Sequence, residues 1–365
     1  MTAPNWIRAA IRAPDRDAER AARQRQARLT KPAGALGELE ALALRLAGLQ
    51  GRECPRLERC QISVFAADHG IAAAGVSAYP QAVTAQMILN FAAGGAAVSV
   101  LARHSGARFE VVNLGTVEPL PAGTEVLDRT LGPGTADFSM TDAMTPAQLE
   151  AALGVGGERV EAALEAGCDL FIAGEMGIGN TSAATALAAL LLDLPPAQLL
   201  GAGTGVDAAG LARKQALIER ALARHRTASN DTLELLRRLG GFEVAAMTGA
   251  CLRAGQLGVP VLVDGFIVTA AALVAVRLQP ALRDWLFFSH RSAEPGHRLL
   301  LEALDARPLL ALDMRLGEGS GAALAWPLLQ SACRLHGEMA TFDEAGVSGP
   351  GDTDSNSTEA SRCRS

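Results

Sequence analysis

The segment Gly317-Glu318-Gly319-Ser320-Gly321 places one carboxylate among glycines, directly before a stretch with helical spacing. Glycines on both sides of Glu318 let a flat ligand approach the carboxylate without an intervening side chain. A carboxylate presented in this way suits a general base. The competing interpretation is structural, because a glutamate at a helix N-terminus is stabilised by the helix dipole. Glu318 is the first candidate catalytic residue.

A second glycine-rich loop, residues 174–181, leads from an apolar run into a helical segment. Backbone N–H groups at the start of a helix bind phosphate, and Thr181 and Ser182 are candidate N-caps of this helix. A third loop, residues 201–207, precedes a helical segment that carries Lys214. Two such loops favour a phosphorylated ligand with Lys214 as its counter-charge. The alternative for residues 174–181 is a turn that binds no ligand.

Several other chemistries lack support in the sequence. Neither loop continues as the Gly-Lys-Ser/Thr of a Walker A motif. Gly203-x-Gly205-x-x-Ala208 matches only the relaxed dinucleotide fingerprint and follows no apolar run, which argues against a nicotinamide-dependent dehydrogenase. The sequence has no metal-type spacing of cysteine or histidine and no G-x-S-x-G motif. We therefore expect neither a metal nor a cofactor, and no serine hydrolase.

The six histidines divide into two groups. His69 and His290 follow apolar runs, so we expect them in loops at one edge of a sheet. We expect the other four on helix surfaces: His104, His225, His297 and His336.

The elements that must position these loops alternate along the chain. Continuous apolar runs, typical of parallel strands covered on both faces, are candidate strands at 62–66, 109–114, 170–173, 259–263 and 285–288. Ala/Leu-rich helical stretches lie at 85–103, 147–166, 181–192 and 211–225. This alternation predicts an α/β fold, three layers deep, with a mostly parallel Rossmann-like sheet. Ligands bind outside the carboxyl ends of such strands, where the polar loops gather, so we expect a small-molecule site there.

Composition narrows the function classes. The chain has 365 residues, 49% of them hydrophobic, and a formal net charge of −6, which argues against nucleic acid or anionic lipid as a partner. The six cysteines include no C-x-x-C pair and suit a reducing cytoplasm. Residues 254–276 form an apolar run, but Asp264 would cost about 2.5–3.5 kcal/mol at a bilayer centre. We expect a buried strand, a turn and a helix there, and no membrane span.

The ends of the chain differ from its middle. Residues 1–50 and 323–345 contain helical segments without strand-like runs, so we expect them to form a small helical domain together. Residues 51–322 are the expected α/β catalytic domain. Residues 346–365 have almost no hydrophobic side chains, which predicts a disordered tail.

Together, the motifs resemble the nicotinate-nucleotide:dimethylbenzimidazole phosphoribosyltransferase family of cobalamin biosynthesis. The resemblance runs in order from about residue 31 to about residue 339. The segments that carry it are Lys31–Gly37 with Leu39-Glu40, Ala67–Ile71, Gly75–Pro80 with Val83-Thr84, Gly174–Thr181, Gly240–Glu243, Met247–Gly249, Val263–Phe266, Ser289–Glu294 and Arg315–Gly321.

This resemblance implies transfer of the 5-phosphoribosyl group of nicotinate mononucleotide to 5,6-dimethylbenzimidazole, with inversion at the anomeric carbon and release of nicotinate. It implies a homodimer, no cofactor, and Glu318 as the general base. The implied substrate-binding residues are Tyr79, Met87, Glu175, Met176, Gly177, Gly179, Asn180, Thr181, Gly203, Lys214, Asp264, Gly265, Ser289, His290, Ser292 and Leu316.

Two positions depart from part of the family. Some members have serine where Tyr79 stands and glutamine where Met87 stands, so the wall of the base pocket is larger and more apolar here. The same reaction on another benzimidazole, a purine or a phenol is therefore the alternative. A non-catalytic nucleotide binder is a further alternative, against which the intact Glu318 loop argues.

Overall fold

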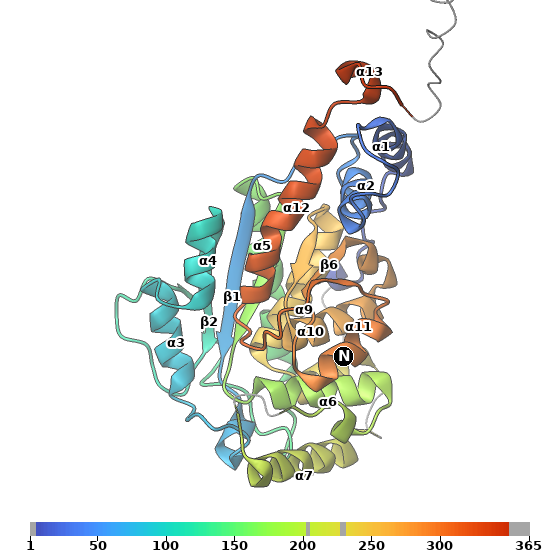
Figure 1. Cartoon of the computed structure of the whole chain (residues 1–365). Coiled ribbons are helices and arrows are strands. Elements are labelled where there is room, and N and C mark those ends of the chain that lie inside the picture. Colours follow the sequence, from blue (N-terminus) through green and yellow to red (C-terminus); the bar gives the residue numbers. More distant parts are fainter. Residues whose placement is uncertain (1–4, 202–204, 227–230, 350–365) are drawn as a thin grey trace, which may run out of the picture. The chain divides into compact units, whose positions relative to one another are not determined.

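Seven parallel strands form one sheet in the computed structural model, which describes residues 5–201, 205–226 and 231–349 (Figure 1). The strand order is β3-β2-β1-β4-β5-β6-β7, and every paired neighbour is parallel. The bounds are β1 Cys60–Ala67, β2 Arg108–Gly115, β3 Leu127–Asp128, β4 Leu170–Met176, β5 Val261–Val263, β6 Leu286–His290 and β7 Pro308–Leu310. The predicted parallel α/β sheet is confirmed.

Helices cover both faces of the sheet. The chain passes from β1 to β2 in one direction and from β4 to β5 in the other, and right-handed crossovers place the two sets of connecting helices on opposite faces. α3 packs against β1 and β2, whereas α5, α9 and α10 pack together over the other side. The helices of this region are α3 Val83–Ala92, α4 Ala97–Ser105, α5 Pro146–Glu165, α6 Asn180–Leu192, α7 Ala208–His225, α8 Thr232–Leu239, α9 Phe242–Leu257, α10 Phe266–Leu278 and α11 Pro295–Ala303.

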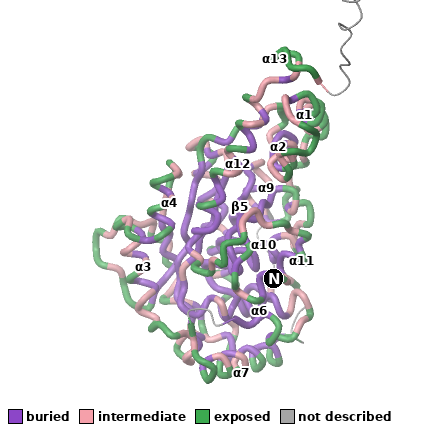
Figure 2. Tube along the Cα trace, in the orientation of Figure 1, coloured by how far each residue is buried: buried purple, intermediate pink, exposed green. Residues whose placement is uncertain are grey.

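The contact between α5 and α9 is backbone against backbone. A Cβ atom on Gly156 would overlap the carbonyl oxygen of Ala246, and one on Gly249 would overlap that of Leu153. Glycine at these two positions lets the helices approach more closely than side chains allow. Aromatics are only 4% of the chain, and small residues such as these glycines are part of its buried interior. Figure 2 shows the buried residues in purple, among them most of α9 and α10.

The predicted single helix at 85–103 is wrong. Residues 93–96 separate α3 from α4, because Gly94 takes a φ of 77° that ends the first helix. By length and apolar composition, the combined stretch Val83–Ser105 is the one part of the described residues that could cross a membrane, and 39% of its most apolar window is buried within the protein. The other apolar run, 254–276, folds into the end of α9, β5 and most of α10, and its middle is fully buried.

The chain divides into two compact units. One holds Met1–Ala13 and Leu57–Pro327, and the other holds Pro14–Arg56 and Leu328–Ser365. Residues 5–13 thus group with the sheet, where the Trp285 indole N–H donates to the Arg12 carbonyl.

The second unit is helical in its described residues. It contains α1 Arg16–Arg28, α2 Glu38–Gln50, the later part of α12 Ser320–Glu338, and α13 Phe342–Ala345. The Arg25 guanidinium donates to the carbonyls of His336, Gly337 and Met339, and Leu29 forms an antiparallel bridge with Thr341. These contacts hold the N-terminal and C-terminal segments of the unit side by side.

Candidate active site

A cavity of about 490 Å³ lies at the carboxyl ends of the central strands, in the first unit. It is next to the point between β1 and β4 where the strand order reverses, the usual ligand position in open α/β sheets. The sequence-predicted residues that line it are Tyr79, Met87, Glu175, Met176, Gly177, Asn180, Thr181, Asp264, Gly265, His290, Ser292, Leu316 and Glu318. Gly179, Lys214 and Ser289 are not in its wall, and Gly203 lies outside the described residues.

Glu318 occupies a constrained turn before α12. Its φ is 66°, between glycines that also have positive φ, and only 6% of the residue is exposed. A Cβ atom on Gly317 would overlap a carboxylate oxygen of Glu175, so glycine is needed for this approach. Burial raises the pKa of the Glu318 carboxyl, and the charge of Asp264 raises it further. The Val98 N–H, which lies 3.4 Å from Glu318 Oε2, lowers this pKa by less than burial raises it. A carboxylate with a raised pKa is a stronger base.

Asp264 holds the Glu318 turn in place. Its carboxylate accepts the backbone N–H groups of Gly319 at 3.2 Å and Ala322 at 2.8 Å, at the start of α12. Burial raises the pKa of Asp264, and nearby His290 together with these N–H groups opposes the rise. The carboxylate therefore acts as an N-terminal cap while one side of the residue faces the cavity.

Glu175 is the second acidic residue at the site. The Asn180 amide donates to its carboxyl group, and so does the Glu318 backbone N–H at 3.3 Å. Burial, followed by the charge of Asp264, raises the pKa of Glu175 to about 8. Glu175 is therefore mainly protonated at neutral pH.

The N-terminus of α6 forms another wall of the cavity. Its N-cap is Gly179, at a φ of 99°, so the predicted capping by Thr181 or Ser182 is wrong. Thr181 instead accepts a hydrogen bond of 2.8 Å from the Lys214 ammonium group, which also donates to the Gly201 carbonyl. Lys214 is 1% exposed, and burial lowers its pKa to about 8 against the opposing charge of Glu294. Lys214 thus lies directly behind Thr181.

The sequence and its fold match one family of enzymes. A family model described as "Phosphoribosyltransferase" matches residues 11–347. The chain belongs to this family. The nicotinate-nucleotide–dimethylbenzimidazole phosphoribosyltransferase of Azotobacter vinelandii is 61% identical over 350 residues, covering 95% of this chain and 99% of that protein. The protein of the same name from Pseudomonas aeruginosa strain UCBPP-PA14 is 59% identical over 343 residues, with 94% and 98% covered.

A solved structure agrees with this family. The nicotinate-nucleotide–dimethylbenzimidazole phosphoribosyltransferase of Thermus thermophilus superposes with a TM-score of 0.87 at 49% identity, covering 92% of this chain and all of that one. The resemblance found in the sequence is confirmed, and the chain is a transferase of the phosphoribosyltransferase type.

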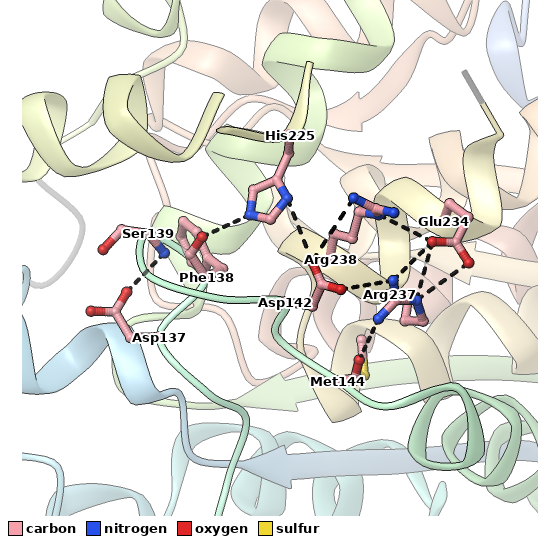
Figure 3. A network of polar contacts seen from close by, with 9 residues as sticks. All are labelled: Asp137, Phe138, Ser139, Asp142, Met144, His225, Glu234, Arg237 and Arg238. Carbon is pink, nitrogen blue, oxygen red and sulfur yellow. Dashed lines mark hydrogen bonds and ion pairs between the residues drawn. The ribbon is translucent and has the colours of Figure 1, made fainter. Parts of the chain in front are cut away.

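Three histidine predictions for this phosphoribosyltransferase are wrong. His225, His297 and His336 are buried, and one ring nitrogen of each forms a hydrogen bond with a backbone group. Figure 3 shows the surroundings of His225, whose Nε2 lies 2.9 Å from the Phe138 carbonyl oxygen. His104 is exposed, as predicted.

His69 was placed correctly at the sheet edge but does not line the cavity of the phosphoribosyltransferase. Its Nε2 lies 2.6 Å from Glu243 Oε1, and both side chains are fully buried. Its ring packs beneath Gly177, where a Cβ atom would lie 3.3 Å from Nε2. His69 therefore supports the loop after β4 from below.

Sequence reasoning missed part of the cavity wall. The additional lining residues are Val83, Ile178, Phe266, Ile267, Val268, Glu294, Arg315 and Gly317. Most of them already lie inside the motifs that carry the family resemblance, although they were not predicted as site residues: Val83, Ile178, Phe266, Glu294, Arg315 and Gly317. Ile267 and Val268 directly follow the motif Val263–Phe266. Among the described residues, no group of three or more His, Cys, Asp or Glu side chains could hold a metal ion.

Proposed function

We propose that this phosphoribosyltransferase transfers the 5-phosphoribosyl group of nicotinate mononucleotide to 5,6-dimethylbenzimidazole, giving α-ribazole 5′-phosphate and nicotinate for the lower ligand of cobalamin. The proposal rests on one observation above all: the buried Glu318 faces a cavity at the carboxyl edge of the sheet, between glycines that leave room for a flat base. The names of the full-length relatives support it.

In this reaction Glu318 is the general base. One benzimidazole nitrogen bonds to the anomeric carbon while the glycosidic bond to nicotinate breaks and its electron pair stays on the pyridine nitrogen, which becomes neutral. The N–H on the other benzimidazole nitrogen then becomes acidic, and its proton passes to Glu318. The raised pKa of Glu318 favours this transfer.

The phosphate is expected at the N-terminus of α6. Thr181 and Ser292 present hydroxyl groups to the cavity, and the Lys214 ammonium group behind Thr181 provides positive charge. Of the remaining proposed substrate contacts, Gly179 is the N-cap of α6 and Ser289 is near the end of β6, whereas Gly203 lies outside the described residues.

The opposite wall would hold the base. Tyr79 and Leu316 line the cavity mouth and are 55% and 59% exposed. With Met87 they form an apolar wall, which suits a dimethylated benzimidazole and leaves another benzimidazole, a purine or a phenol as the alternative acceptor. Exposed apolar side chains at a cavity mouth also suit burial by a second copy, so we propose a homodimer in the cytoplasm, with no nucleic-acid partner.

Incubation with nicotinate mononucleotide and equimolar dimethylbenzimidazole, benzimidazole, adenine and phenol, followed by mass analysis, tests the reaction. We expect nicotinate and α-ribazole 5′-phosphate in equal amounts, with dimethylbenzimidazole consumed first. Preferential consumption of another base would support the alternative acceptor. Release of nicotinate with no ribosylated base would contradict the transferase proposal. Sedimentation velocity over a range of concentrations tests the homodimer.

A further inference from the structure

A buried chain of hydrogen bonds connects two loops of the active site without entering the cavity. The Ser292 backbone N–H donates to His297 Nδ1 at 2.8 Å. His297 Nε2 lies 3.0 Å from Thr269 Oγ1, and the Thr269 hydroxyl lies 3.3 Å from the Asp264 carbonyl oxygen. His297 and Thr269 are both 0% exposed.

The donor and the acceptor of every hydrogen bond in this series follow from the bond at its Ser292 end. A backbone N–H can only donate, so His297 Nδ1 must be an unprotonated acceptor. The proton of the neutral ring is then on Nε2, which donates to the Thr269 oxygen. The Thr269 hydroxyl consequently donates its own proton to the Asp264 carbonyl, which can only accept. A protonated His297 would place an N–H against the Ser292 N–H.

The two ends of the chain belong to different walls of the cavity. Ser292 is in the loop after β6, and Asp264 is in the turn after β5. The Ser292 hydroxyl oxygen accepts the Glu294 N–H at 3.2 Å, so its own proton is free to be donated to a ligand. The orientation of that hydroxyl depends on where the Ser292 backbone is held.

We propose that His297 is a positioning residue for the phosphoribosyl substrate: as its Nε2–H tautomer it ties the loop after β6 to the turn after β5, and so directs the Ser292 hydroxyl toward the mononucleotide. The charged surroundings support a neutral ring. Burial, and then the neighbouring His290 with its ring centre 6.1 Å away, lower the pKa of His297 to about 3. The Asp264 carboxylate, on the turn after β5, is already bound to α12 N–H groups.

Two amide variants separate the two halves of the chain. In His297→Asn the side-chain oxygen takes the place of Nδ1 and can still accept the Ser292 N–H. In His297→Gln the side-chain amide takes the place of Nε2, and the buried Ser292 N–H loses its acceptor. We expect His297→Gln to raise the KM for nicotinate mononucleotide roughly tenfold, because fewer molecules hold the competent loop. In His297→Asn the increase should be less than about threefold.

Thr269 provides a matched pair at the other end. Thr269→Ser keeps the hydroxyl, and Thr269→Val removes it with little change in shape. Like His297→Asn, Thr269→Val breaks only the Thr269 half of the hydrogen-bond chain, so we expect it to raise the KM for the mononucleotide by less than about threefold, and Thr269→Ser to leave it near normal. In all four variants kcat and the KM for dimethylbenzimidazole should change less than about twofold, because neither residue contacts the base or Glu318.

The tautomer of His297 is measured separately, by a method that does not depend on enzyme activity. In ¹⁵N-histidine NMR spectra of the full chain, we expect the ring signals that disappear in His297→Gln to be those of a neutral ring with the proton on Nε2 from pH 8 to pH 5. A His297 ring that protonates above pH 5 would overturn the proposal. So would a melting temperature that falls in His297→Gln with an unchanged KM, because the residue would then be purely structural.

Discussion

The backbone at Glu318 takes a left-handed conformation that a residue with a side chain rarely adopts. Such strain persists only where surrounding contacts enforce it, and here Asp264 binds two N–H groups of the turn. The carboxylate is thereby fixed at the cavity while α12 begins directly behind it. Strain and burial together are what distinguish Glu318 from a glutamate that merely stabilises a helix dipole.

Glu318→Gln tests the base directly. The amide keeps the shape of the side chain and cannot take a proton, so we expect turnover to fall about 10²–10⁴-fold. The dissociation constant for nicotinate mononucleotide should stay within about threefold of normal, since the loss concerns the base step. Steady-state kinetics and calorimetric titration measure both quantities. Full turnover by this variant would remove Glu318 from the mechanism.

Glu175→Gln tests the raised pKa of Glu175. The folded-state pKa of about 8 exceeds the ordinary value of 4.5, so the folded state holds this proton more tightly than the unfolded state. The stability that follows is fully present below pH 4.5 and is lost as the pH rises through about 8. Urea titrations at pH 5, 7 and 9 should show a smaller decline of the unfolding free energy in Glu175→Gln than in the unaltered protein. Parallel declines in both proteins would contradict the raised pKa.

Tyr79→Ser tests the wall for the base. A buried aromatic pair contributes about 0.5–1.5 kcal/mol beyond area burial, so loss of the ring should weaken dimethylbenzimidazole by up to about tenfold. The substrate preference should shift toward bulkier bases, because the pocket is larger without the ring. Comparing kcat/KM for dimethylbenzimidazole, benzimidazole and adenine in both proteins measures the effect. If the order of preference stays the same while the melting temperature falls, Tyr79 only packs its loop.

At the scale of elements, continuous apolar runs located β1, β2, β4, β5 and β6. The two edge strands, β3 and β7, were missed, because they are only two and three residues long and neither is fully buried. Positions of loops followed from the strands, so most of the cavity wall was predictable. The partners of individual side chains could not be predicted. The burial of His297 and of Lys214 depends on residues that are distant in the sequence and meet only in the folded chain.

Lys214→Met tests the role of α7 behind the phosphate position. Methionine fills a similar space without the ammonium group, so the positive charge beside Thr181 disappears. We expect binding of nicotinate mononucleotide to weaken at least tenfold, and binding of nicotinate riboside, which lacks the phosphate, to change little. Competition titrations with both ligands measure this difference. Equal losses for the two ligands would show that Lys214 does not act on the phosphate.

At the scale of the whole molecule, a polar network ties distant segments together (Figure 3). Asp142, in the loop before α5, accepts from Arg237 of α8 at 2.8 Å and lies 3.7 Å from the His225 ring at the end of α7. Arg237 also binds Glu234 and the Met144 carbonyl. The network fixes one long loop against two helices, one of which carries Lys214.

Asp142→Ala should therefore lower the free energy of unfolding by about 1–3 kcal/mol, because Arg237 keeps its buried position with one carboxylate fewer. Guanidinium titration monitored by circular dichroism measures the change. Glu302→Gln is the matched control: it breaks an exposed ion pair with Arg298, and we expect a change within about 0.5 kcal/mol. Equal effects in the two variants would mean that the network adds no stability.

The close backbone contact of α5 and α9 has a consequence for experiments that substitute every position and score survival. Because Gly156 and Gly249 admit no Cβ atom without displacing a neighbouring backbone, nearly every substitution there should inactivate the enzyme. In such an experiment Gly156 and Gly249 would tolerate substitution as poorly as Glu318, although neither glycine lines the cavity. Separating the two causes requires a measurement of protein abundance beside the measurement of activity. Loss of the α5–α9 contact should lower the amount of folded protein, whereas loss of the general base should not.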